Sequence, residues 1–435
     1  TGSGKSSAVA AIIRSVLDHK FGDKQARPRI ILIDPHGEYA RAFKDRAQVL
    51  RAYDTTDKAP EHVKQLRLPY WLMSSDEFRL LVVGKTEFEA TSQANTVYKA
   101  LRHARLVEAG VITAASSDVK DTAPKSSPQD PIYVAGKSEK DAQEFDRDKP
   151  LPFSIEEFRR HIEWRQPYKT GTQTRLAEGD FHKEYGSILD KLAVLRADKR
   201  TKFLMDDYKK GDPDLAKILG QFVDEAKDEK DLKIVDISGL PNEVAGPLTA
   251  SIARLLFQYK LYQTDEERRR DPLLLVCEEA HRYVPNHGEA QYAAAQSAIR
   301  RIAREGRKYG LGLMLVSQRP SDVEATVLAQ CNTWLVLRLS NASDQAHVMK
   351  MLPDGLTGMT SLLSSLPRQE ALFVGEGAAL PSRIRLRTLE EEQLPKSSDI
   401  PFAGGWIDPP LQEPEIAAIA GRMIGKWEKN DPNGN

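Results

Sequence analysis

The chain begins with the residues Thr1-Gly2-Ser3-Gly4-Lys5-Ser6, which match the second half of the pattern G-x-x-x-x-G-K-[ST]. Glycines in that pattern let successive backbone N–H groups curl around the phosphates of a nucleoside triphosphate. Lys5 is spaced to reach the β- and γ-phosphates, and the Ser6 hydroxyl is spaced to bind Mg²⁺. The sequence therefore predicts a phosphate-binding loop, with contacts from Gly2, Ser3, Gly4, Lys5, Ser6 and Ser7.

A helix is expected directly after this loop. Within residues 7–20, apolar side chains recur at i, i+3, i+4, i+7 and i+8, which is the spacing of one helix face. The phosphates would then lie at a helix N-terminus, where the dipole and the free N–H groups favour anions. The first glycine of the pattern and the strand that feeds the loop would precede Thr1, and there is no initiator Met. We therefore expect this sequence to be a fragment of a longer chain.

Two adjacent acids, Glu278 and Glu279, follow the apolar run 273–277. Ligands bind outside the carboxyl ends of the strands in open α/β sheets, so acids at a strand end can reach a bound nucleotide. Glu278 would hold the Mg²⁺ shell through water, and Glu279 would orient or deprotonate the water that attacks the γ-phosphate. A strand that ends in two solvated acids is common, so the pair alone is weak support for a catalytic role. The phosphate loop in the same chain strengthens the catalytic interpretation.

Two further polar residues end apolar runs. Gln318 follows residues 311–316 and would sense the γ-phosphate and hold the attacking water, although a simple strand-to-loop cap fits equally well. Asp34 follows residues 29–33 and is predicted to contact the nucleotide or the subunit boundary.

Arg304 and Arg307 belong to a cluster of basic residues before Tyr309-Gly310. One interpretation is that these cations complement the dipole at a helix C-terminus on a solvated face. The other is that one of them is an arginine finger, donated to the γ-phosphate held by a neighbouring subunit in a ring. The sequence leaves both interpretations open.

Strand-like and helix-like segments alternate in two parts of the chain, which predicts an α/β fold with a doubly wound, mostly parallel sheet. Strands are expected at 29–33, 233–237, 273–277, 311–316 and 333–339, with edge strands near 372–374 and 384–386. The predicted organisation is a first part of the nucleotide-binding domain at 1–110, a polar mobile insertion at 111–150, a helical insertion at 151–230, the second part of the domain at 231–390, and a tail with one helix at 391–435.

The bulk composition narrows the function classes. Basic and acidic residues are equal at 63 each, so no global field attracts a polyanion, which argues against a simple basic DNA coat but leaves room for a locally positive channel. Cys277 and Cys331 lie within or beside apolar runs, which predicts free thiols of a reducing compartment and hence a cytoplasmic location. No apolar run approaches the ~20 residues of a membrane span, so no membrane partner is predicted.

Five motifs together resemble the HerA family of the FtsK/HerA superfamily. In chain order they are Thr1-Gly2-Ser3-Gly4-Lys5-Ser6, Ile33-Asp34-Pro35-His36-Gly37-Glu38-Tyr39, Glu278-Glu279-Ala280-His281-Arg282, Ile302-Ala303-Arg304-Glu305-Gly306-Arg307-Lys308-Tyr309-Gly310 and Ser317-Gln318-Arg319-Pro320. The resemblance implies a RecA-like P-loop ATPase with ATP and Mg²⁺ as ligands. It implies a homo-hexamer that moves on double-stranded DNA, with its sites between subunits.

The resemblance also assigns roles to residues. It implies that Lys5 and Ser6 hold phosphate and metal, Glu279 is the catalytic acid, Gln318 senses the γ-phosphate, and Arg304 or Arg307 acts in trans. Members of the family act with an end-processing nuclease in DNA repair, and some bacterial relatives act in anti-phage defence with a nuclease or a sirtuin-type NAD-consuming effector.

One departure from the family pattern concerns the acid pair. The family usually carries Asp-Glu where this chain has Glu278-Glu279. The extra methylene would shift the metal-side carboxylate outward by about a bond length.

Three other functions remain compatible with the motifs. One is a secretion or conjugation ATPase that pumps protein or DNA, and another is a ring scaffold that organises an effector enzyme with ATP as an assembly signal. A small-molecule P-loop kinase fits poorly, because such kinases seldom need a helical block of this size between the two halves of the site.

Overall fold

The computed structural model describes residues 4–53, 63–84, 90–113, 132–165, 182–209, 211–223, 230–286, 293–351, 360–395, 405–407 and 409–423. Of the predicted phosphate loop, Gly2 and Ser3 lie outside these residues. Residues 114–131 of the predicted polar insertion also lie outside them. The domain boundaries drawn from the sequence remain predictions.

A six-stranded sheet forms the centre of the molecule. Its strands are β3 (Arg29–Asp34), β4 (Ala47–Arg51), β5 (Val63–Gln65), β6 (Leu232–Asp236), β7 (Leu273–Cys277) and β8 (Leu311–Leu315). The order is β5-β4-β6-β3-β7-β8, and every neighbouring pair is parallel. The inner strands are aliphatic on both faces, as expected for a parallel sheet covered on both sides. The predicted α/β class is confirmed.

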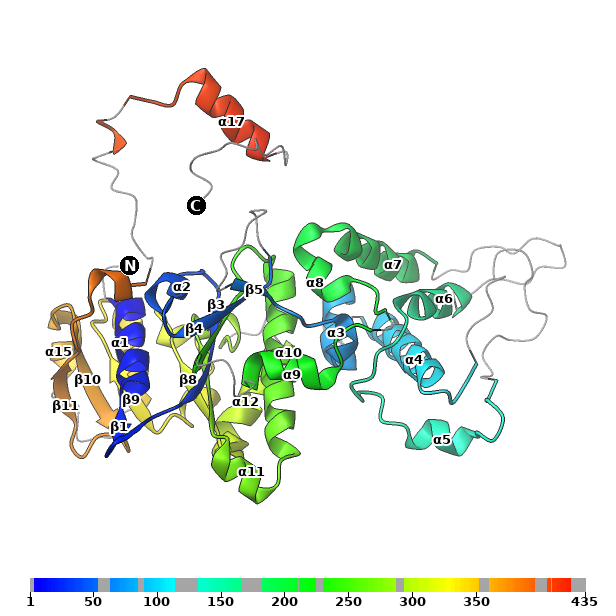
Figure 1. Cartoon of the computed structure of the whole chain (residues 1–435), viewed down its shortest axis with the longest axis horizontal. Coiled ribbons are helices and arrows are strands. Elements are labelled where there is room, and N and C mark those ends of the chain that lie inside the picture. Colours follow the sequence, from blue (N-terminus) through cyan, green and yellow to red (C-terminus); the bar gives the residue numbers. More distant parts are fainter. Residues whose placement is uncertain are drawn as a thin grey trace.

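Helices cover both faces of this sheet (Figure 1). Side chains alternate along a strand, so Ile30 and Leu32 of β3 face one side and Ile31 and Ile33 face the other. The first side packs against α1 (Lys5–Leu17) and α2 (Tyr39–Ala42), and the second packs against α10 (Asn242–Leu261) and α12 (Ala293–Glu305). The sheet is therefore doubly wound, and the helices on both faces fix the positions of its strand ends.

A helical part lies beside the sheet between β5 and β6 (Figure 1). It contains α3 (Ser75–Val83), α4 (Thr91–Glu108), α5 (Glu139–Glu144), α6 (Ile155–Arg165), α7 (His182–Ala197), α8 (Lys202–Met205) and α9 (Leu215–Val223). Its buried side chains, such as Phe158 and Leu192, share one hydrophobic cluster with Leu248 of α10. The helical part and the sheet therefore share a continuous hydrophobic core.

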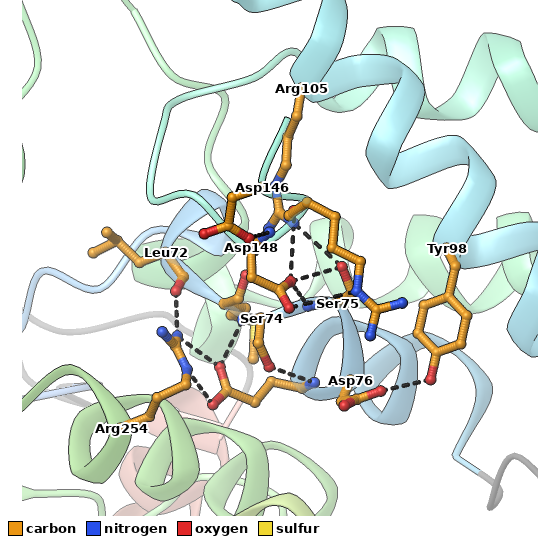
Figure 2. A network of polar contacts seen from close by, with 12 residues as sticks. Leu72, Ser74, Ser75, Asp76, Tyr98, Arg105, Asp146, Asp148 and Arg254 are labelled. Atoms are coloured by element: carbon orange, nitrogen blue, oxygen red, sulfur yellow. Dashed lines mark hydrogen bonds and ion pairs between the residues drawn. The ribbon is translucent and has the colours of Figure 1, made fainter. Parts of the chain in front are cut away.

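A buried polar network fastens the two parts together (Figure 2). Arg254 of α10 donates to Glu77 of α3 at 2.7 Å and to the carbonyl of Leu72. Arg105 of α4 is fully buried and donates to the carbonyl of Met73 at 2.7 Å. Removing one partner of such a network leaves a buried charge uncompensated, which costs about 3–5 kcal/mol. The network fixes α3 and α4 against α10.

The C-terminal third holds a second, antiparallel sheet. Its strands are β9 (Thr333–Val336), β10 (Glu370–Gly375) and β11 (Ser382–Arg385), in the order β11-β10-β9. The sequence placed 333–339 in the parallel series, and this was wrong. Residues 333–336 instead pair antiparallel with β10, where Leu372 and Val374 meet Val336 and Trp334 across the strands and cover a small core of their own.

The remaining described elements are short or peripheral. They are β1 (Lys20–Phe21), β2 (Lys24–Gln25), α11 (Asp265–Arg270), α13 (Ala325–Leu328), α14 (Ala342–Met351), α15 (Thr360–Ser365), α17 (Glu413–Met423) and the 3₁₀ helices η1 (Tyr70–Leu72), η2 (Lys199–Thr201), η3 (Ala280–Arg282), η5 (Gly306–Tyr309), η6 (Pro320–Asp322) and η8 (Glu391–Gln393). Among the residues described, no helix combines the length and apolar character that crossing a bilayer requires. Both cysteines are free thiols.

Candidate active site

The described part of the phosphate loop ends at the N-terminus of α1. Gly4 precedes the helix with φ 77° and ψ 23°, a left-handed conformation that glycine adopts without steric cost. The first N–H groups of an α-helix have no partner within the helix, and no acid occupies the first turn of α1. Lys5 and Ser6 are nearly buried in this turn. The helix start therefore offers backbone donors and one cation to an anion.

Two acids at the end of β7 meet this lysine. The Nζ of Lys5 lies 2.9 Å from Oε1 of Glu278 and donates a shorter hydrogen bond to Oε1 of Glu279. Glu279 has φ 53° and ψ 50°, which is uncommon for a residue other than glycine. Such a conformation persists only where the surrounding structure enforces it, and it often marks a functional position. The chain turns here so that both acids point at Lys5.

The two acids differ in protonation. Burial raises the pKa of Glu278 to about 7, although Lys5 opposes that rise. Burial also acts to raise the pKa of Glu279, but Lys5 and Gln318 outweigh it, so its pKa lies below the usual range. Neighbouring carboxyls whose pKa values are pushed apart commonly divide acid and base roles. Glu279 is the ionised member and can accept a proton from water.

Gln318 reaches the same carboxylate from the neighbouring strand. Its Nε2 donates to Oε1 of Glu279 at 2.7 Å. The strands β7 and β8 are parallel neighbours, so their carboxyl ends, and the residues that follow, meet at one edge of the sheet. The structure thus brings together the predicted residues Lys5, Glu278, Glu279 and Gln318.

Asp34 lies at the end of β3, beside this group, and is fully buried. Its carboxylate accepts the N–H groups of His36 at 3.2 Å, Gly37 at 2.9 Å and Tyr39 at 3.0 Å. Burial raises the pKa of Asp34 to about 6, although the N–H bond from Tyr39 opposes this. The carboxylate therefore organises the turn after β3. A direct contact with nucleotide remains a prediction.

Tyr39 is a site residue that the sequence analysis missed. It is fully buried, and its hydroxyl lies beside Ser6 and Glu278. Burial and the charge of Glu278 raise its pKa. Tyr39 stood within one of the motifs, but nothing in its type or spacing distinguished it from a core tyrosine.

The residues present fit a magnesium–nucleotide complex. Within the described part of the chain, Oε2 of Glu278 and the hydroxyl of Tyr39 are buried without a hydrogen-bond partner. The Tyr39 hydroxyl lies beside both Ser6 and Glu278, and Mg²⁺ prefers one or two protein oxygens together with water and substrate phosphates. Open space surrounds the position of a Cβ on Gly4. Ser6 and Glu278 are thus suited to the metal shell, and the start of α1 is suited to the phosphates.

Arg304 and Arg307 lie away from this group. Arg304 belongs to the last turn of α12 and Arg307 to η5, which leads into the N-terminal end of β8. Five residues of β8 separate that end from Gln318, about 17 Å at ~3.3 Å per residue. Both side chains are exposed. Within one chain, neither arginine belongs to the cluster around Lys5.

The fold and the clustered residues define a class of protein, a P-loop ATPase built on a RecA-like sheet. Residues 1–256 match the family model described as the central domain of helicase HerA, which is more than half of the chain. The chain therefore belongs to the HerA family, as its motifs predicted.

Two relatives illustrate the match. The chain is 38% identical over 120 residues to the DNA double-strand break repair helicase HerA of Pyrococcus furiosus, covering 28% of this chain and 21% of that one. It is 25% identical over 433 residues to a probable DNA double-strand break repair helicase HerA of Methanocaldococcus jannaschii, covering 94% of this chain and 73% of that one. The match to the first relative thus spans about a fifth of its length.

Solved structures share the fold. VirB4 of Thermoanaerobacter pseudethanolicus superposes with a TM-score of 0.52 at 15% identity, covering 90% of this chain and 88% of that one. The plasmid coupling protein TrwB, in complex with the non-hydrolysable GTP analogue GDPNP, gives 0.50 at 14% identity, covering 90% and 84%. At these identities the likeness shows the α/β fold alone.

Proposed function

We propose that this protein hydrolyses ATP to drive movement along double-stranded DNA, as part of a homo-hexameric ring. The observation that carries the proposal is the meeting of Lys5, Glu279 and Gln318 at one edge of the sheet, in a chain of the HerA family. A buried carboxylate held by a lysine from the phosphate loop and an amide from the next strand is the arrangement that water activation beside a phosphate requires.

Each residue has a defined task in this proposal. The N–H groups at the start of α1 and the Lys5 ammonium bind the triphosphate, so Lys5 exchanges its carboxylate contacts for phosphate oxygens. Bound Mg²⁺ would supply charge neutralisation at the β- and γ-phosphates, held through Ser6 and Glu278. Glu279 orients the attacking water and accepts its proton, and Gln318 holds both the carboxylate and the water.

The ring is supported by the position of the arginines. Arg304 and Arg307 lie at the opposite edge of the sheet from Lys5, so a γ-phosphate within reach of either belongs to another subunit. A finger of this kind stabilises the charge of the transferring phosphoryl group. We propose that Arg307 or Arg304 completes the site of the neighbouring subunit, and that six copies close the ring.

The proposed nucleic-acid substrate rests on the names of the relatives, and the proposed partners rest on the family resemblance of the motifs. The relatives from Pyrococcus furiosus and Methanocaldococcus jannaschii are named as repair helicases for DNA double-strand breaks. We propose that this protein acts in the cytoplasm on double-stranded DNA with an effector protein, either a nuclease or a sirtuin-type NAD-consuming enzyme, in DNA end processing or anti-phage defence.

The test is ATP hydrolysis by the full-length gene product, with and without linear duplex DNA, beside the Glu279→Gln variant. We expect hydrolysis that duplex DNA stimulates and that rising salt suppresses, because sequence-independent DNA binding rests on phosphate contacts. Glu279→Gln should bind nucleotide without turnover. A wild-type protein that neither hydrolyses ATP nor assembles beyond one copy would overturn the proposal.

A second candidate is a conjugation-type pump, because the plasmid coupling protein TrwB shares this fold, which is therefore compatible with either function. The same assay separates the two candidates. Stimulation by a protein substrate but not by duplex DNA would favour a pump that moves protein. If ring assembly and effector activity both survive Lys5→Ala and Glu279→Ala, the ATP-dependent scaffold is favoured instead.

A further inference from the structure

A histidine lies against the proposed catalytic acid. His281 belongs to η3, two residues after Glu279, and its Nδ1 is 3.3 Å from Oε2 of Glu279. The same Nδ1 is 3.3 Å from the hydroxyl oxygen of Ser317, at the end of β8. Ser317 is fixed in turn, because its oxygen accepts the N–H of Arg319 at 3.1 Å. One imidazole nitrogen therefore touches both strand ends that form the site.

The backbone around His281 is tied to the sheet. The N–H of Ala280 donates to the carbonyl of Val316 at 2.8 Å, and the N–H of Arg282 donates to the carbonyl of Glu279 at 2.8 Å. The first bond links the turn after β7 to the last residue before Ser317, and the second closes the turn itself. The ring of His281 is consequently placed by the same strand ends that place Glu279 and Gln318.

The two oxygens of Glu279 have different neighbours. Oε1 accepts from Lys5 and from Gln318, whereas Oε2 is buried without a hydrogen-bond partner among the described residues and lies 3.3 Å from Nδ1 of His281. If Lys5 turns toward phosphate during the reaction, Oε1 loses its cation and keeps the amide. The last torsion of a glutamate is broad, so a carboxylate held at one oxygen can still rotate. A hydrogen bond formed from the nearby Nδ1 of His281 to the second oxygen would restrict that rotation.

We propose that His281 is a positioning residue, which holds Oε2 of Glu279 and fixes the carboxylate relative to Gln318 once Lys5 engages the nucleotide. A carboxylate only accepts hydrogen bonds, so the ring must carry its hydrogen on Nδ1 in this contact. The inference rests on the proposed ATP hydrolysis and adds a residue that does not touch the nucleotide itself.

Three substitutions of His281, to Asn, Gln and Ala, test the role. The Asn and Gln side chains both carry an amide N–H donor, but they place it at different distances from the backbone. In His281→Asn the amide nitrogen falls near the place of Nδ1, and in His281→Gln it falls near the place of Nε2. His281→Ala removes the contact altogether. We expect His281→Ala to lower kcat by roughly 10- to 100-fold, because a misplacement of about 1 Å costs up to about 100-fold.

The kinetic pattern distinguishes positioning from a structural role. KM for ATP and the affinity for ADP should stay within about twofold of wild type, because His281 leaves the phosphate contacts untouched. His281→Asn should recover most of kcat, and His281→Gln should remain near the alanine variant. His19→Ala is the matched control, since His19 is exposed beyond the far end of α1. It should match wild type in every measurement.

Each other outcome overturns the inference. It fails if His281→Ala keeps wild-type kcat, if Asn and Gln rescue equally, or if ADP affinity falls together with kcat. Should His281→Ala not fold, the comparison of the Asn and Gln variants still decides. A wild-type protein without ATPase activity would instead overturn the proposed function, so the two failures are distinguishable.

Discussion

The charged side chains around Lys5, at the carboxyl edge of the parallel sheet, differ in burial from Arg307, at its amino edge. At the carboxyl edge, Lys5, Glu278 and Glu279 have side chains that are 7%, 3% and 5% exposed, and they contact one another directly. At the amino edge, Arg307 is 87% exposed and its contact with Glu376 spans 3.5 Å. Lys5 and its two acids form a buried cluster, whereas Arg307 and Glu376 form an exposed pair.

The difference separates what one chain completes alone from what it offers to another. Breaking a buried ion pair leaves an uncompensated charge, so the carboxyl edge must be assembled within the subunit. An exposed pair contributes about 0–1 kcal/mol, so Arg307 can leave Glu376 for a new partner at little cost. The first edge is suited to hold a nucleotide, and the second is suited to act on the nucleotide of a neighbour.

The largest expected effect comes from removing the buried cation. Lys5→Ala should abolish ATP hydrolysis and destabilise the folded protein by about 3–5 kcal/mol, because Glu278 and Glu279 would lose their cation. Denaturant unfolding and a phosphate-release assay measure the two effects. Lys5→Met combined with Glu278→Gln and Glu279→Gln should restore most of the stability and none of the activity. An alanine variant as stable as wild type would contradict the buried cluster.

The exposed arginines should show the converse behaviour. Arg304→Ala and Arg307→Ala should each change stability by less than about 0.5 kcal/mol. One of them should lower hydrolysis by about 1000-fold, within the range for arginine fingers. Mixing that variant with Glu279→Gln subunits should restore part of the activity, because one interface then receives an intact arginine and an intact acid. Absence of complementation for both arginines would contradict a shared site.

The raised pKa values at the carboxyl edge predict a pH effect on stability. Glu278, at about 7, and Asp34, at about 6, bind protons in the folded state at pH values where the unfolded chain has released them. Their stabilising contribution is therefore present below their ordinary pKa values and is lost as pH rises through 6 to 7. For Glu278 the loss is on the order of 2–3 kcal/mol.

The measurement is the free energy of unfolding between pH 5 and pH 8, with Glu278→Gln as the control. The variant should lose the part of the decline that belongs to Glu278, which alone continues from about pH 6 to pH 7, and keep the part below pH 6 that belongs to Asp34. A wild-type protein that gains stability over this interval relative to the variant would refute the assignment.

The smallest effect concerns the departure from the family pattern. Glu278→Asp withdraws the carboxylate by about a bond length. A ligand that acts through water tolerates this, so the Mg²⁺ concentration for half-maximal hydrolysis should change by less than about tenfold. A Mg²⁺ titration at saturating ATP measures it, with Glu279→Asp as the comparison. The latter should lower kcat much more, since its carboxylate must reach the water.

Much of the site could be predicted from the sequence because parallel strands bring their carboxyl ends to one edge. Glu278, Glu279 and Gln318 each follow an apolar run, and the parallel pairing of β7 and β8 carries that pattern into space. Tyr39 could not be predicted, because only the turn that Asp34 organises carries its hydroxyl to Ser6 and Glu278. The sequence does not indicate that this turn buries the Tyr39 side chain beside the site.

The sheet itself was predicted less completely. The strands β4 and β5 were not expected, because Gln48 and Arg51 interrupt the apolar pattern of the first and the second has only three residues. The strand β4 forms because β6 offers hydrogen-bonding groups beside it, and β5 forms because β4 then does the same. The antiparallel sheet was missed for a related reason, since a short apolar run carries no information about the direction of its partner.

The place of β3 in the sheet has a consequence for synthesis on the ribosome. This central strand emerges before both of its hydrogen-bonded neighbours, β6 and β7, which follow about 200 or more residues later. Until then its backbone groups lack their hydrogen-bond partners in the sheet and its aliphatic side chains stay exposed. The helical part can already collapse on local contacts. The nascent chain is therefore most exposed to misassembly during that interval, and a chaperone that shields residues 29–34 would raise the yield of native protein.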